Sequence, residues 1–361
     1  MMLTANLPIA AKTSTGKREY SKEIKKDFRY YGSEMVSLEN QFGKVSVETW
    51  QKNHVKIAIE IKVKAENESK AQKIFDRIKI QFMDSNDLIG AITLINKEEK
   101  SWWDWSNENT DFEINYAVFM PADANLSVNN KYGDVYLASL NGSVKMSLKY
   151  GKYQCDGFSD DCQLILKFAD GTVNLAKNMT AELKYGSMKL LKAEELKVDS
   201  KYSNIEIKNI INVKAETGYD NYKIHEVEEF ILNGKYNNIT IDKVQVLFAN
   251  SKYSHFDIGH VDNFVSFDVA YSEVKIDFVN PTFNEIRLQG RYSDFDIDLA
   301  ESTNYQLDAK SEYAGIIYPQ TMKVSYEKEK SSLHEVLGGT GAEGSPIIKA
   351  RLKYGSLKIR K

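Results

Sequence analysis

The sequence predicts an all-β protein, a parallel β-solenoid with about 17 to 18 residues per rung. A phrase of Lys, Tyr, a small residue and alternating apolar residues recurs along the chain, as in KYSNIEI from Lys201 and KYNNITI from Lys235. Tyr202, Tyr219 and Tyr236 are each 17 residues apart. Apolar residues two apart indicate strands, and a fixed period of this length indicates stacked repeats. A right-handed coil is expected, because parallel crossovers are right-handed by default.

Columns of equivalent positions predict which side chains each rung buries. Counted from the tyrosine, the third and fifth residues are apolar, as at Ile205 and Ile207. The eighth residue, such as Ile210, is also apolar, and strict alternation would not place it there, so a corner is expected between them. The fifteenth position is small, which predicts a tight place in the interior. Its members are Ser200, Thr217, Gly234 and Ser251.

Two other architectures fit this period less well. A repeat of this length is too short for the two packed helices of a helical solenoid. A meander of hairpins would need a turn signal every ~8–12 residues and would reverse direction each time, so its inward columns would not stay in phase. A single rung cannot be stable alone, and the ladder hydrogen bonds must come from stacked neighbours.

The chain is predicted to have three parts. Residues 1–34 form a leader and N-terminal arm, and residues 35–120 form a first rung with a strand-helix insertion and a tryptophan loop. Residues 121–361 form the regular solenoid. A mobile, Gly-rich loop is expected near residues 328–346, before a final rung that returns to the columns.

The insertion in the second part combines both kinds of secondary structure. Phe42 occupies the tyrosine position of the first rung, and a long alternating strand follows it. Apolar residues at helical spacing after Asn67 predict a short amphipathic helix over Glu68–Lys79. This helix is expected to cap the open end of the first rung, because an uncovered strand edge would pair with another chain.

Composition narrows the range of functions. Of the 361 residues 27% are charged, and the formal net charge is only −3, so there is no general basic footprint for nucleic acid. No apolar run approaches the ~20 residues of a membrane span. The start, MMLTANLPIAAKTS, has the composition of the tail of a secretory signal without its basic beginning, and a polar leader is the alternative.

The two cysteines are both expected to face the core. Cys155 lies in the fifth-position column, and Cys162 alternates with apolar residues. Two buried thiols and a disulfide across one turn of the coil are both compatible with this placement.

Five features follow one another along nearly the whole chain: NQFGKVSVETW, an alternating strand with a short helix, NYAVFMP, serial Tyr-Gly rungs, and a Gly-rich loop before the last rung. In this order the chain resembles the "putative adhesin" family of secreted Gram-negative β-solenoid proteins, which is related to autotransporter adhesin head GIN domains. The resemblance implies an extracytoplasmic β-helix, in the periplasm or at the cell surface, with an adhesive role and no catalytic residues. The chain departs from the family in its regular tyrosines and in lacking a complete signal or lipid anchor.

The outward side chains suggest two contact surfaces. The basic residues before each tyrosine, among them Lys201, Lys235 and Lys252, should stack into a row that could hold an anionic partner. The tyrosines beside them are expected to stack ring over ring at a corner, and a platform for sugar rings is the alternative.

The tryptophans of the irregular loop are the best single candidate for contact with a ligand or partner. Trp102, Trp103 and Trp105 are large apolar rings in a segment where such rings are less expected, and packing against the solenoid is the other interpretation.

Other polar residues do not form a recognisable metal or catalytic motif. Asp294, Asp296 and Asp298 alternate on one strand but lack the Gly and terminal Glu of a calcium loop, so a solvated acidic patch is expected. No cofactor or metal is predicted.

The sequence therefore favours a non-enzymatic scaffold that binds a glycan or a surface protein along its flank. The alternative is a polysaccharide-active β-helix enzyme, a lyase or hydrolase.

Overall fold

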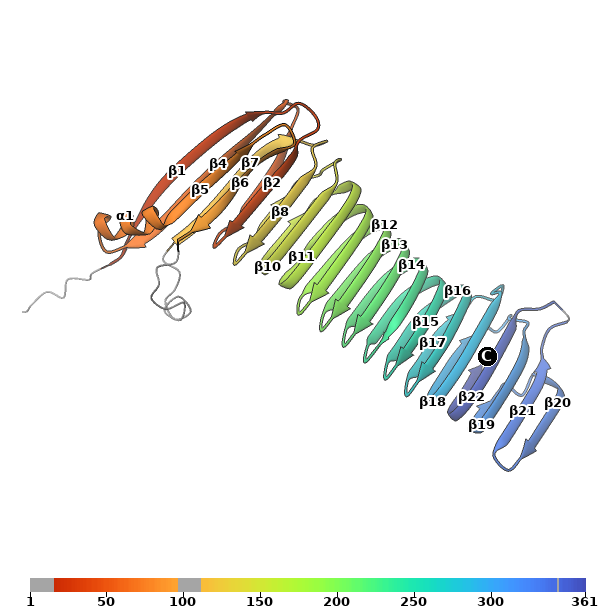
Figure 1. Ribbon diagram of the computed structural model, residues 1–361. Helices are drawn as coiled ribbons and strands as arrows, with labels where there is room; N and C mark the ends of the chain where they lie inside the picture. Colours follow the sequence, from red (N-terminus) through yellow and green to blue (C-terminus); the bar gives the residue numbers. More distant parts are fainter. Residues whose placement is uncertain (1–15, 97–111, 343) are drawn as a thin grey trace, which may run out of the picture.

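The stacked strands of successive rungs form a rod, seen from the side in Figure 1. The computed structural model describes residues 16–96, 112–342 and 344–361. Within these residues 22 strands are joined by pairings that are mostly parallel, with a single helix at the N-terminal end. The all-β, mostly parallel architecture is confirmed. The hand of the coil stays a prediction.

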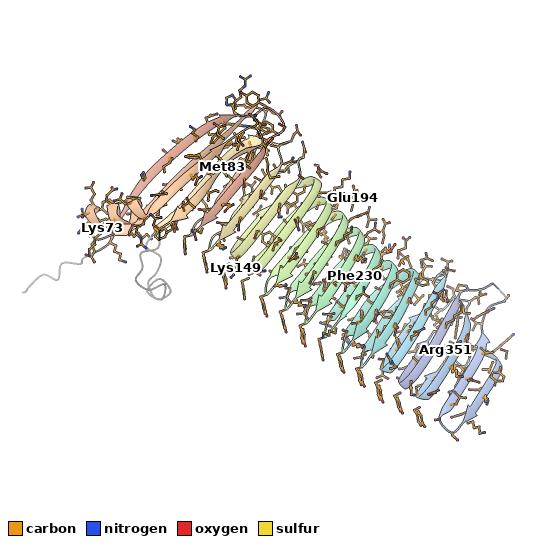
Figure 2. All side chains as sticks on the ribbon, in the orientation of Figure 1. Lys73, Met83, Lys149, Glu194, Phe230 and Arg351 are labelled. Atoms are coloured by element: carbon orange, nitrogen blue, oxygen red, sulfur yellow. The ribbon has the colours of Figure 1, made fainter. Side chains whose placement is uncertain are left out.

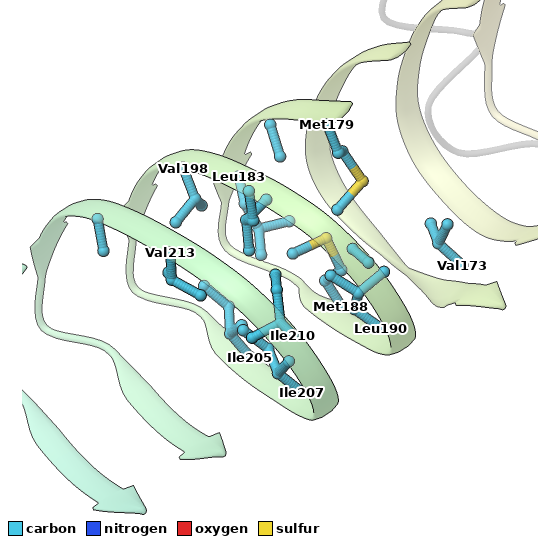
Figure 3. Packing of buried hydrophobic residues seen from close by; sticks show 14 of the residues in the cluster. Val173, Met179, Leu183, Met188, Leu190, Val198, Ile205, Ile207, Ile210 and Val213 are labelled. Carbon is cyan, nitrogen blue, oxygen red and sulfur yellow. The ribbon is translucent and has the colours of Figure 1, made fainter. Parts of the chain in front are cut away.

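The regular rungs stack in the register that the columns predict. Ile207 pairs with Ile224, which pairs with Ile241, which pairs with Ile258. All four side chains are fully buried, and Figure 3 shows the same packing around Ile205, Ile207 and Ile210. The rung strands are β8 (Leu126–Lys131), β9 (Val135–Leu137), β10 (Val144–Cys155), β11 (Phe158–Lys184), β12 (Ser187–Lys201), β13 (Asn204–Gly218), β14 (Asn221–Lys235), β15 (Asn238–Lys252), β16 (His255–Ala270), β17 (Glu273–Val279) and β18 (Glu285–Leu299).

Each rung bends where the column spacing changes from two to three. In the pairing of β13 with β14, Lys208 and Ile211 have no partner in the register. These two residues lie on either side of the buried Ile210. The corner expected between the fifth and eighth positions is therefore confirmed. The small column is interior as well, since Ser200 and Ser251 are 0% and 1% exposed.

The N-terminal end contains strands that run in both directions. In the first rung β2 (Met35–Gln41) and β3 (Val45–Trp50) pair in parallel with β8 and β9. Two antiparallel extensions continue the two sides of this rung. One contains β1 (Arg18–Arg29), β4 (His54–Ala65) and β7 (Phe112–Pro121), and the other contains β5 (Ile78–Asp84) and β6 (Leu88–Ile95).

The predicted helix is present as α1 (Glu68–Arg77) and connects these two extensions. It does not cap the first rung as expected, because β6 and β7 pair with that rung instead. The Asn67 side chain caps it by accepting a hydrogen bond from the Lys70 backbone N–H, and Ala71 and Phe75 are buried. Strand β1 was not predicted inside the N-terminal arm. Its Phe28 lies 6.0 Å from Phe82 of β5, ring centre to ring centre, so the two outer strands approach each other.

The C-terminal end contains a hairpin where an irregular loop was expected. Residues 328–346 include the end of β20 (Lys323–Lys330) and all of β21 (Leu333–Gly339), which pair antiparallel. Strand β21 also pairs with β19 (Gln306–Ile317). The last strand, β22 (Ile347–Arg360), returns to the columns as predicted but lies between β18 and β19 (Figure 1).

Both cysteines are free thiols in the core. Burial raises the pKa of Cys162 to about 12 and raises the pKa of Cys155 as well. Of the two arrangements that the sequence allowed, the structure has the unbridged one.

Candidate binding flank

The tyrosine positions form one continuous ladder of rings along the solenoid. Adjacent ring centres lie 4.6–5.2 Å apart, and adjacent ring planes differ by 1–14°. We call this the ring ladder. Its members, in spatial order, are Phe42, Tyr132, Tyr150, Phe168, Tyr185, Tyr202, Tyr219, Tyr236, Tyr253, Tyr271, Tyr292, Tyr354 and Tyr313.

Every member of the ring ladder has a left-handed backbone, with φ between 51° and 62°. The sequence placed the corner at this step but assigned the turn geometry to the small residue after the ring. In the structure the aromatic residue itself adopts the turn conformation. Its backbone N–H still donates to a carbonyl of the next rung, as from Tyr202 to Gly218 at 3.1 Å. This conformation costs a non-glycine residue about 1–2 kcal/mol, and ring stacking offsets part of that cost.

The stacked arrangement exposes ring edges and covers ring faces. From Tyr132 to Tyr292 the rings are 38–51% exposed, and Figure 2 shows the row of outward side chains near Lys149. Because each face is occupied by its neighbour, an internal ring cannot offer a face to a sugar. The sugar platform considered from the sequence is therefore wrong for internal rungs, and the structural ladder is confirmed.

A chain of buried hydrogen bonds lies just inside the ladder. In six rungs the residue after the ring is polar, and in the first five of them its backbone N–H donates to the equivalent side chain of the next rung. Ser203 donates to Asp220 Oδ1 at 2.7 Å, and Asp220 donates to Asn237 Oδ1 at 3.1 Å. We call these the polar rungs. Their residues are Ser203, Asp220, Asn237, Ser254, Ser272 and Ser293.

Asp220 is the most heavily bonded member of this chain. Asp220 is only 1% exposed. Besides the Ser203 N–H, it accepts hydrogen bonds from the hydroxyls of Ser200 and Thr217 at 2.9 and 2.5 Å and from the Gly218 N–H at 3.0 Å. Four donors therefore stabilise a buried carboxylate without a cation.

An open groove of about 850 Å³ lies beside the ladder over the polar rungs. The ring edges from Tyr219 to Tyr292 form one wall, and Asp220 and the following polar residues form the floor. The second residue after each ring forms the other wall. We call this the polar groove, and its outer wall contains Asn221, Asn238, His255, Glu273 and Asp294.

The outer wall of the polar groove was not identified from the sequence. Its side chains form cross-rung contacts, such as Asn221 Nδ2 donating to Asn204 Oδ1 at 2.9 Å and His255 Nδ1 lying 3.3 Å from Glu273 Oε2. The available signal was a column of outward polar residues two positions after the tyrosine. The apolar columns dominate the pattern, so this polar column is hard to separate from other outward residues.

The basic residues of the predicted row come directly before each ring residue. They therefore lie on the opposite side of the ring ladder from the polar groove, which is formed by the residues after each ring. Lys235 and Lys252 are paired neighbours, but Lys201 is separated from Lys235 by Gly218. The three lysines are exposed, and none forms an ion pair with a described carboxylate. Further along, Ala270 interrupts the row again. The structure therefore brings the lysines to one flank, but as short groups of neighbouring rungs and not as one continuous row.

The predicted contact residues Trp102, Trp103 and Trp105 lie outside the described residues. In residues 16–96, 112–342 and 344–361, no three His, Cys, Asp or Glu side chains are grouped to hold a metal. The same ranges contain no helix with the length and apolar character needed to cross a membrane.

No protein-family model and no curated protein matches this chain. Among solved structures, a "putative cell adhesion protein" from Clostridium sporogenes is 11% identical with a TM-score of 0.21, over 94% of this chain and 99% of that chain. A "putative lipid binding protein" from Parabacteroides distasonis is 10% identical with a TM-score of 0.29, over 94% and 97%. A "putative adhesin" from Bacteroides fragilis is 14% identical with a TM-score of 0.29, over 76% and 97%. At these scores neither fold nor function is transferred from them.

Proposed function

We propose that this protein is a non-enzymatic, extracytoplasmic binding protein that holds an extended glycan in the polar groove along its flank. The observation that carries the proposal is the repetition of one polar wall residue and one ring edge per rung, with rings 4.6–4.9 Å apart from Tyr219 to Tyr292. The extracytoplasmic location draws support from the order of sequence motifs and from the composition of the N-terminal residues.

The spacing and chemistry of the groove favour a linear glycan parallel to the solenoid axis. An extended β-1,4-linked hexose chain advances per sugar by close to the distance between rungs. Adjacent sugars are turned over relative to each other, so every second sugar presents the same edge to an equivalent side chain. Amide groups such as those of Asn221 and Asn238 both donate and accept, as sugar hydroxyls do. Glu273 and Asp294 make the far end of the wall acidic, which disfavours a polyanionic glycan.

The shape of the groove supports binding without catalysis. Its two walls are single columns of side chains on a regular rod, and the long loops that could enclose a reacting bond are not part of its lining. An enzyme of this architecture would need a closed cleft around paired acids. Adjacent Glu273 and Asp294 are the one pair in the groove lining that could test this alternative, because they are Cα partners in neighbouring rungs.

The test is retention on insoluble β-1,4-glucan and chitin, followed by a glycan array. Replacing Asn221→Leu and Asn238→Leu together should weaken binding about tenfold, because each lost hydrogen bond contributes about 1 kcal/mol or less. The matched control, Asn212→Leu with Asn250→Leu, changes two exposed asparagines away from the groove and should bind normally.

Three results would contradict the proposal. Equal retention of both double variants would move the site away from the groove. Loss of binding on Trp103→Ala alone would place it at the tryptophan loop, the second proposed contact. Release of reducing ends from the glycan, abolished by Glu273→Gln, would replace binding with catalysis.

A further inference from the structure

The last strand of the chain, β22, lies next to β18, where β19 would lie if the strands stacked in sequence order. Strands β12, β13, β14 and β15 each pair with the strands before and after them in sequence. After β18, however, the chain forms β19 two positions away, and β22 returns to pair in parallel with both. The segment 347–361 therefore fills a slot between two earlier strands (Figure 1).

The apolar side chains of β22 complete the core of this slot. Ile348, Leu357 and Ile359 are at most 1% exposed. The ring of Tyr354 also completes the ring ladder, with its centre 4.6 Å from Tyr292 and 5.1 Å from Tyr313. The slot thus has the same burial and stacking as an ordinary rung, although its strand comes from the chain terminus.

Charge distinguishes this strand from its neighbours. Residues 347–361, IIKARLKYGSLKIRK, contain only basic charged side chains. Lys349 Nζ lies 3.0 Å from Glu285 Oε1 of β18, and Arg351 Nη2 lies 2.8 Å from Asp308 Oδ2 of β19. Exposed pairs of this kind contribute little free energy each. Their pattern nevertheless selects a basic strand for an acidic slot.

The acidic run on β18 is part of this selection. Arg360 Nη1 donates to Asp296 Oδ2 at 2.8 Å, Arg360 also pairs with Asp298, and Ser356 Oγ donates to Asp294 Oδ1 at 2.6 Å. The carboxylates of Asp298 and Asp296 hold the pKa of Arg360 above its usual range. The acidic patch expected from the sequence is present and partly solvent-exposed, and its three aspartates also bind β22.

The connection to β22 is suited to a change of direction. Residues 340–346 link it to β21 and include Gly341 and Gly344, the latter with φ of +89°. A terminal strand on a glycine-containing link can leave its slot without disturbing the order of the other strands.

We propose that β22 is an exchangeable strand: residues 347–361 of one copy can occupy the β18–β19 slot of a second copy, giving a reciprocal dimer joined near the C-terminal ends. The core contacts and ion pairs are the same in both states, since the slot and the strand are the same. Only the path of residues 340–346 differs, so concentration decides between monomer and dimer. This inference goes beyond the proposed glycan binding and does not depend on it.

A charge-reversal mixture tests the exchange. One variant has a reversed slot, Asp296→Lys with Asp298→Lys, and the other has a reversed strand, Arg360→Glu. In each variant alone, the strand and its own slot carry like charges and repel each other. In a mixed dimer that exchanges strands, each strand enters a slot of opposite charge. We expect native mass spectrometry to show at least about tenfold more dimer in the mixture than in either variant, a difference of about 1.4 kcal/mol. The chain with all three substitutions is the control, because its strand again matches its own slot, and it should form no more dimer than the unmodified protein at the same concentration.

A disulfide trap gives a second measurement in variants that are expected to fold. Asp294 and Ser356 are Cα partners, so Asp294→Cys in one copy and Ser356→Cys in another should form a bond only after exchange. Oxidation of the mixture should give a covalent heterodimer between these positions, and the chain with both cysteines should cyclise internally. A mixture with no more dimer than the separate variants, or an oxidised mixture without the 294–356 bond, would overturn the proposal.

Discussion

The inner corner beside the ring ladder is built differently in the two halves of the solenoid. In the first half the residue after the ring is usually glycine, and we call these the glycine rungs, with Gly43, Gly133, Gly151 and Gly186. A Cβ at Gly133 would lie 2.0 Å from the Gly43 carbonyl oxygen. In the second half the polar rungs place Ser, Asp or Asn there, and those side chains accept hydrogen bonds from backbone N–H groups.

The two halves therefore differ in the backbone groups that their side chains satisfy. In the first two glycine rungs the buried groups that need partners are carbonyls, and the Asn130 amide donates to the oxygens of Gly43 and Gly133 at 3.0 and 2.9 Å. In the polar rungs hydroxyl, amide and carboxylate oxygens accept hydrogen bonds from backbone N–H groups, and serine hydroxyls such as that of Ser254 also donate to carbonyls. The position two before the ring and the position one after it must therefore be matched within each rung.

The largest expected effect comes from placing a charge in the small column of the polar rungs. Ser251 is 1% exposed, and its hydroxyl lies 2.7 Å from that of Ser254. Replacing Ser251→Glu should cost several kcal/mol, because the interior has neither room nor a cation for a carboxylate. Thermal unfolding measures the loss. The neighbouring exposed residue gives the control, and Asn250→Glu should melt close to the unmodified protein. An unchanged melting curve for the Ser251 variant would contradict the interior placement.

The next effect tests the acceptor chemistry of the polar rungs. Asp220→Ala should destabilise the protein by about 3 kcal/mol, because several buried donors lose their acceptor at once. Asp220→Asn keeps one acceptor oxygen and should cost clearly less. Hydrogen exchange at the Ser203 and Gly218 amides locates the damage. Equal stability of the two variants would show that the carboxylate is not the acceptor that matters.

The glycine rungs should lose stability when the side-chain amide that donates to their carbonyls is removed. Asn130→Ala removes the amide that donates to the carbonyls of Gly43 and Gly133, and a cost of about 1–3 kcal/mol is expected. Asn129→Ala, at the exposed neighbouring position, should be nearly neutral. If the two alanine variants unfold together, the amide at position 130 does not satisfy these carbonyls.

Much of this architecture could be predicted from sequence, because burial repeats with the rung. The apolar columns, the corner before Ile210, the first rung at Phe42 and the helix after Asn67 all follow from periodic or capping patterns. The position of β22 could not be predicted in this way. Every rung carries the same apolar pattern, so the pattern identifies a rung without saying which slot it fills.

Features without a periodic signal were also missed. Strand β1 is charged and only Phe28 of it is buried, so it has no alternation to detect. The polar groove depends on which outward columns lie side by side, and that is fixed by the corner geometry of the ring residue. The left-handed backbone of a tyrosine is unfavourable in isolation, and only the stack of rings explains it.

The smallest expected effect separates the cost of that backbone from the benefit of the stack. Tyr236 has φ of 59° and stacks on Tyr219 and Tyr253 at 4.6 and 4.9 Å. Tyr236→Ala loses both ring contacts and keeps the unfavourable conformation, whereas Tyr236→Gly loses the contacts and removes the conformational cost. The glycine variant should therefore be more stable than the alanine variant, by about 1 kcal/mol. At Lys214, an exposed strand residue without positive φ, the order should reverse, since alanine is normally better than glycine in a strand. The measurement is the melting temperature of the four variants, and an alanine advantage at both positions would mean that the corner carries no backbone strain that glycine relieves.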